Sequence, residues 1–146
     1  MPNVSTYSFT DVNATISHPG YGSYTIQGEG IGDMTISKTT DRSVHDVASD
    51  GSIMVSKIAG NNGSVAINAQ QTSSLHKFLQ GLFNYCWQDD TSKWAQISMT
   101  VEAPKMGKTY YCSNGSFVKE PDEPFQGQGQ RVAWNILFAD IQRIQL

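Results

Sequence analysis

Residues 52–82 read SIMVSKIAGNNGSVAINAQQTSSLHKFLQGL and contain the strongest structural signals in the chain. Two runs with alternating apolar residues, at about 52–58 and 64–71, flank Asn61-Asn62-Gly63. Asn and Gly tolerate the positive φ angles that tight hairpin turns require. The pattern therefore predicts that these two runs form a β-hairpin.

A helix is predicted directly after this hairpin, over about residues 73–88. Ser73 or Ser74 is a suitable N-cap, because a serine hydroxyl accepts from a free backbone N–H of the first turn. Apolar side chains recur at i, i+3, i+4 and i+7 along one stripe, which we expect to be buried. The stripe consists of Leu75, Phe78, Leu79, Leu82, Phe83 and Cys86.

The remaining alternating runs predict further strands, with a second hairpin around Asn114-Gly115. These runs lie at about 11–17, 24–26, 33–38, 94–103, 108–112, 116–119 and 131–145. About eight strands and one helix indicate a mainly β fold, a β-sandwich or barrel of two packed sheets with one flanking α-helix. We expect a single domain over residues 1–146.

Two segments do not fit the strand pattern. Residues 1–10 are polar with a few aromatic side chains and are predicted to form an N-terminal arm. Residues 39–51 are charged, lack a clear period and end in the turn signal Asp50-Gly51. A long loop inside a compact domain is often functional, so we expect residues 39–51 to form a protruding loop. An ordinary surface loop is the alternative.

The composition points to protein contacts rather than to nucleic-acid binding. Charged residues make up only 16% of the chain, the net charge is −3, and no cluster of Lys or Arg occurs. Tight phosphate binding is therefore disfavoured. Uncharged polar side chains suit large protein–protein contacts, although an ordinary β-rich domain has a similar composition. The first residues do not resemble a signal peptide, and no run is long and apolar enough for a membrane helix, so we expect a cytoplasm-like compartment during synthesis.

No arrangement of residues predicts an enzyme, a metal site or a cofactor. His18, His45 and His76 do not have metal-ligand spacing and are expected in a turn, a loop and on a helix surface. Cys86 lies on the apolar stripe and predicts a buried thiol, while a disulfide to Cys112 remains an alternative.

Two other groups of side chains offer weaker alternatives. Glu120, Asp122 and Glu123 lie together in a segment rich in Pro and Gly, which predicts a solvated loop rather than a pair of catalytic carboxylates. Gly28-Glu29-Gly30-Ile31-Gly32 precedes a predicted strand instead of the helix that a phosphate-binding loop requires. A sugar-binding platform built from Trp87, Trp94 and Trp134 is the remaining alternative.

The chain resembles the tail tube proteins of contractile-tailed bacteriophages. The resemblance is carried by Asp50-Gly51 before a strand, by the turn at Asn61-Asn62-Gly63, by Gln71-Thr72-Ser73 at the helix start and by the closing strand VAWNILFADI at 132–141. It implies two sheets packed as a sandwich with a flanking helix, and hexameric rings stacked into a tube. It further implies a lumen through which the tape measure protein and DNA pass without specific binding.

The resemblance also implies partners and candidate sites. The expected partners are other copies of the chain, the tail sheath protein, and tail terminator and baseplate proteins, in a virion tail assembled in the host bacterial cytoplasm. Polar strand residues expected to face the lumen are Gln96, Ser98, Thr100 and Asn135. Residues expected at the contact between rings are Asp41, Arg42, His45, Asp46 and Asp50. The alternatives are a tube protein of a type VI secretion or tailocin system, and a carbohydrate-binding β-sandwich.

Overall fold

The computed structural model describes residues 4–8, 11–26 and 31–145. Part of the predicted N-terminal arm and most of the glycine run at 28–32 lie outside these residues. The strands are β1 (Asn13–His18), β2 (Gly22–Ile26), β3 (Ile31–Lys38), β4 (Ser43–Val47), β5 (Ile53–Lys57), β6 (Gly63–Gln70), β7 (Ile97–Ala103), β8 (Lys108–Phe117) and β9 (Arg131–Gln145). The helices are α1 (Ser74–Gln88) and two short 3-10 turns, η2 (Thr91–Lys93) and η3 (Pro104–Met106).

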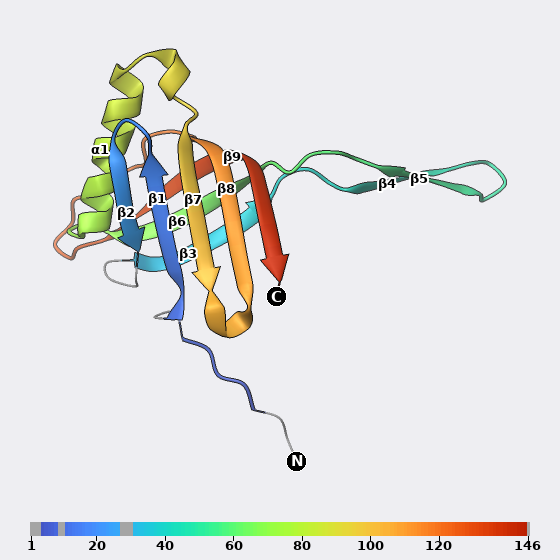
Figure 1. Ribbon diagram of the computed structural model, residues 1–146, viewed down its shortest axis with the longest axis horizontal. Coiled ribbons are helices and arrows are strands. Elements are labelled where there is room, and N and C mark those ends of the chain that lie inside the picture. Colours follow the sequence, from blue (N-terminus) through green and yellow to red (C-terminus); the bar gives the residue numbers. More distant parts are fainter. Residues whose placement is uncertain (1–3, 9–10, 27–30, 146) are drawn as a thin grey trace.

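Seven strands form one antiparallel sheet in the order β2-β1-β7-β8-β9-β6-β3. The sheet curls, so that β2, β1, β7 and β8 lie in front of β6 and β3 and cross them (Figure 1). Helix α1 stands at one side of this half-barrel and packs against β2 and β6. The predicted mainly β fold with one flanking helix is confirmed, and its architecture is that of a curled, barrel-like sheet.

The hydrophobic core fills the concave side of the sheet. Alternate residues of the long strands point inward, as their periodicity predicts: Val65, Ile67 and Ala69 of β6, and Val132, Trp134, Ile136 and Phe138 of β9. Leu75, Leu79 and Leu82 of α1 close the core from the helix side and are fully buried. Burying each of these leucine side chains stabilises the fold by about 1.5–3 kcal/mol.

The helix begins where the sequence predicts. Ser73 is the N-cap, and its hydroxyl accepts a hydrogen bond from the backbone N–H of His76 at 3.2 Å. The helix ends after Gln88, where the backbone N–H of Asp89 still donates to the carbonyl of Tyr85. The predicted span over about 73–88 is therefore confirmed.

The predicted hairpin around Asn61-Asn62-Gly63 is wrong. Strand β5 pairs with β4 in a separate two-stranded sheet, whereas β6 pairs with β3 and β9. One face of β6 is buried in the core, and the strand lies inside the large sheet between β3 and β9. The carbonyls of Asn61 and Asn62 accept from the N–H groups of Ile141 and Thr39, so these residues bridge elements distant in sequence.

The predicted loop at 39–51 has more order than its sequence indicates. Residues 43–47 form β4, and the β4–β5 hairpin extends far from the half-barrel (Figure 1). The turn signal at its tip is confirmed: Gly51 has a φ of 90°, and the Asp50 carboxylate accepts from the backbone N–H and the hydroxyl of Ser52. These hydrogen bonds lower the pKa of Asp50.

The predicted second hairpin at Asn114-Gly115 is also wrong. Strand β8 runs without interruption from Lys108 to Phe117, and Asn114 adopts a φ of 55° inside it. The pairing with β7 shifts by one residue there, which identifies a β-bulge. Asn114 tolerates the positive φ of a tight turn, and here the same tolerance allows a β-bulge in a continuous strand. The strand expected over 94–103 begins later, at Ile97, after the 3-10 turn η2.

Gly63 is predicted to stabilise the fold by allowing the close approach of β6 to β3. A Cβ at this position would collide with the backbone carbonyl oxygen of Ser37. Gly63→Ala is therefore expected to lower the free energy of unfolding by about 1–3 kcal/mol, measured by urea denaturation of unassembled subunits. Gly127→Ala is the matched control, because a Cβ there meets no atom within 4 Å. Equal stability of the two variants would contradict the prediction.

Candidate functional site

The described residues contain no group of three or more His, Cys, Asp or Glu side chains placed to hold a metal ion. Within the same residues, no helix is long and apolar enough to cross a membrane. Cys86 and Cys112 are both buried and free, so the alternative disulfide is not formed. Burial raises the pKa of both thiols, and that of Cys112 reaches about 11. Because the thiolate is the reactive form, neither cysteine is suited to nucleophilic chemistry.

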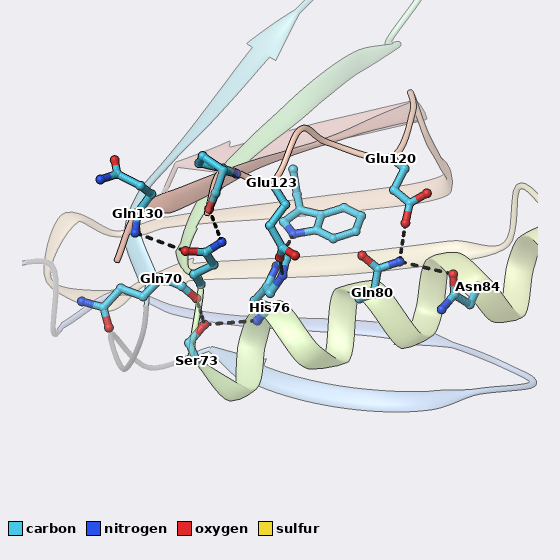
Figure 2. Close-up of polar contacts among 11 residues, drawn as sticks. Gln70, Ser73, His76, Gln80, Asn84, Glu120, Glu123 and Gln130 are labelled. Atoms are coloured by element: carbon cyan, nitrogen blue, oxygen red, sulfur yellow. Dashed lines mark hydrogen bonds and ion pairs between the residues drawn. The ribbon is translucent and has the colours of Figure 1, made fainter. Parts of the chain in front are cut away.

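His76 lies at the centre of a polar cluster between α1 and the segment that follows β8 (Figure 2). Its Nδ1 accepts a hydrogen bond from Nε1 of the buried Trp134 at 3.0 Å, so its proton lies on Nε2. Nε2 faces the Glu123 carboxylate at 2.5 Å. The prediction of a helix-surface histidine is wrong, because His76 is only 7% exposed. It supplies the hydrogen-bond acceptor that the indole N–H needs inside the core.

His18 is a second buried histidine with both ring nitrogens engaged. Its Nδ1 accepts from the backbone N–H of Gly20 at 3.1 Å, and its Nε2 lies 2.9 Å from the carbonyl oxygen of Lys93. The residue ends β1 and links the β1–β2 turn to η2. A structural role accounts for every polar atom of this ring.

Residues 118–130 form a strap, defined here as the irregular segment between β8 and β9. Gln71 donates to the carbonyl of Pro124 at 2.6 Å and accepts from the backbone N–H of Gln130 at 3.3 Å. Gln80 of α1 donates to Glu120 at 2.7 Å (Figure 2). The expected solvated loop is therefore tethered. Glu120 and Glu123 each contact a side chain of α1. Asp122 is exposed, and the described residues show no such contact between it and α1.

The tryptophans do not form a common sugar-binding surface. Trp134 is fully buried and packs edge-on against Phe117. Trp87 is 71% exposed, and its ring lies 6.0 Å from the ring of the half-buried Trp94. The alternative of a three-tryptophan platform is therefore excluded, because Trp134 is buried in the core.

The convex face of the sheet is rich in uncharged polar side chains. Ser98 and Thr100 of β7 and Asn135 of β9 lie on this face, and Gln96 is exposed immediately before β7. The Ser98 hydroxyl lies 2.8 Å from the Ser17 hydroxyl of β1. Strand alternation places few charged side chains here among the described residues: Asp33, Glu102, Arg131 and Asp140. The face is therefore weakly charged, with more acid than base.

The β4–β5 hairpin carries all five residues that the sequence assigned to a contact between subunits. His45 and Asp46 lie on β4, Asp41 and Arg42 precede it, and Asp50 is at the tip. Sequence reasoning missed the apolar residues beside them, because the run at 53–55 reads as an ordinary core strand. Their exposed fractions lie between 47% and 65%: Val44, Val47, Ile53, Met54 and Val55. An isolated two-stranded hairpin is marginal in water, and exposed apolar clusters mark interaction surfaces.

This fold, with a curled sheet and a side helix, is similar to that of chains in structures of contractile injection systems. A chain in the cryo-EM structure of the anti-feeding prophage baseplate matches with a TM-score of 0.62 at 10% identity, covering 99% of this chain and 97% of the other. A chain in the sheath-tube complex of the PVC extracellular contractile injection system matches with a TM-score of 0.56 at 7% identity, covering 91% and 88%. No curated protein sequence matches the chain.

The chain belongs to the Bacteriophage PhiTE tail tube protein family, whose model matches residues 4–145. The predicted resemblance to phage tail tube proteins is thereby confirmed. Membership of this family identifies the protein as a structural, non-enzymatic component of a virion tail.

His76→Leu is predicted to destabilise the subunit by about 1–3 kcal/mol, because the buried Trp134 N–H loses its hydrogen-bond acceptor, His76 Nδ1. Glu123→Gln is the matched control: it keeps an oxygen acceptor near Nε2 at a partly exposed position and is expected to cost less. Urea unfolding followed by tryptophan fluorescence measures both effects. A loss that is larger for Glu123→Gln than for His76→Leu would contradict this assignment.

Proposed function

We propose that copies of this chain form hexameric rings that stack into the inner tube of a contractile tail. The β4–β5 hairpin is the observation that carries the proposal, because its apolar side chains are not covered by any described part of the chain. The sheet also has two edges, β2 and β3, whose unpaired backbone groups favour association. The baseplate structure that contains a similar chain was averaged with sixfold symmetry, which supports hexameric rings.

The tube would act as a conduit for DNA, with the convex sheet face as its lumen wall. A conduit must let its cargo move, and a wall dense in Lys and Arg would hold the phosphates. Ser98, Thr100, Asn135 and Gln96 offer polar, uncharged groups instead, and the charged residues of the face are mostly acidic. The tape measure protein would occupy the same lumen before DNA ejection.

The remaining assignments follow from this role. Residues 1–146 act as one tail tube domain, with an arm at 1–10 and an inter-ring element at 39–51. The sheath encloses the tube, terminator and baseplate proteins complete its ends, and assembly takes place in the host bacterial cytoplasm. Similar chains occur in structures of a sheath-tube complex and of a sheath/tube terminator, which supports these partners. The same fold in injection systems favours a type VI secretion or tailocin tube as the second candidate.

The lumen assignment predicts size-selective labelling of Asn135→Cys. In assembled tubes, a small maleimide is expected to react, whereas a maleimide fused to a protein wider than the bore is expected to be excluded. Cys86 and Cys112 are not expected to react with the maleimide, because burial raises the pKa of their thiols and shields them from the reagent. Unassembled Asn135→Cys subunits are the control and should react with both reagents. Full reaction of assembled tubes with the large reagent, detected by mass spectrometry, would place this face outside the lumen.

Charge reversal on the hairpin is predicted to block stacking. Asp41→Lys with Asp46→Lys should abolish tubes in negative-stain electron microscopy while leaving circular dichroism and thermal unfolding unchanged, because both side chains are exposed. The control is Asp90→Lys with Asp122→Lys, which makes the same charge change at exposed positions outside the hairpin. Tubes of normal length from the hairpin variant would contradict the inter-ring role.

A further inference from the structure

An apolar groove opens at the mouth of the curled sheet, between β3 on one side and β7 and β8 on the other. It has a volume of about 330 Å³, and its lining includes Met34, Ile36, Val101 and Tyr110. Val101 belongs to the buried core, while Met34, Ile36 and Tyr110 are only partly covered. Tyr7 and Val12 of the N-terminal segment also belong to the lining. The groove therefore continues the hydrophobic core to the surface.

The rim of this groove is basic. Lys108 forms part of the lining, and the Arg143 guanidinium lies 5.0 Å above the ring centre of Tyr110. Lys105, in the adjoining turn η3, pairs with Asp11 at 3.2 Å. Lys108 and Arg143 thus provide positive charge beside an apolar surface, and such a site favours a partner that combines apolar side chains with a carboxylate.

One face of the β4–β5 hairpin has this combination. The register pairs Asp46 with Met54 and Val44 with Ser56, so Val44, Asp46 and Met54 share a face. Val44 is 47% and Met54 60% exposed. This hairpin points away from its own half-barrel (Figure 1), so it is directed at a neighbouring molecule instead of its own groove.

We propose that the hairpin of one copy docks into the mouth groove of the next copy, with Val44 and Met54 against Ile36 and Tyr110 and with Asp46 beside Lys108. This proposal rests on the tube function and deepens it by naming the acceptor surface. The contact joins two different patches of identical chains. Such heterologous contacts propagate from copy to copy, as the growth of rings and tubes requires.

A charge swap tests the pairing of Asp46 with Lys108. Asp46→Lys and Lys108→Asp are each expected to reduce the fraction of protein that sediments as tubes by about tenfold or more, because each places like charges together. The double variant restores the opposite charges and is expected to recover tube formation. Lys77→Asp is the matched control, since this exposed lysine lies on α1, outside the groove lining, and it should assemble as the unchanged protein does.

Disulfide trapping provides a readout that does not depend on charge. Met54→Cys with Ile36→Cys is expected to give a ladder of covalent oligomers on a non-reducing gel after mild oxidation of assembled tubes. Either single variant should remain monomeric on the gel, because Cys86 and Cys112 are buried.

The outcomes separate this proposal from the tube function. If Lys108→Asp assembles normally while Asp41→Lys with Asp46→Lys does not, the hairpin stacks against another surface and the groove assignment is overturned alone. A failed charge swap together with an absent ladder in intact tubes overturns it as well. If neither the hairpin nor the groove variants change tube formation, the tube function stands, and both the inter-ring role of the hairpin and the groove assignment are overturned. If the unchanged protein forms no tubes, the tube function itself fails.

Discussion

The pairing around Phe138 is the constraint on which the rest of the structure depends. Strand β9 pairs with β6 through its first half and with β8 through its second half, and Phe138 is opposite Gly63 on one side and Gly115 on the other. A side chain at Gly115 would meet the Phe138 ring at 2.5 Å. Gly115 therefore makes room for the Phe138 ring, while Gly63, opposite Phe138 on β6, lets β6 approach the backbone of β3 at Ser37. Because β9 is paired with β6 and with β8, it joins the two halves of the curled sheet around one core.

Local patterns in the sequence predict the elements well, but not their partners. The periods of β6, α1 and β9 are properties of short segments, so their bounds follow from alternation and capping. Pairing depends on contacts between distant residues. Asn61-Asn62-Gly63 has the chemistry of a tight turn, yet burial of both edges of β6 between β3 and β9 outweighs that local preference. Asn114 also favours a turn by its residue type, but in the structure its positive φ lies at a bulge within β8.

The candidate surfaces were predictable to a similar degree. Alternation alone places Ser98 and Thr100 on one face of β7, and the charged segment at 39–51 correctly indicated an exposed element. The apolar half of the hairpin was not predictable, because Ile53, Met54 and Val55 have the composition of a buried strand. Only the three-dimensional structure reveals that this strand lies outside the core. His76 was missed for a related reason: its burial is explained by Trp134 and Glu123, each far away in the sequence.

The buried thiols have a consequence for the particle outside the cell. Because Cys86 and Cys112 are unpaired and buried within each subunit, neither is placed to join copies by a disulfide in the tube proposed above. Air oxidation would therefore not crosslink the proposed tube through these thiols. Such a tube would be held together by non-covalent contacts between copies, and we expect a chaotrope without a reducing agent to take it apart.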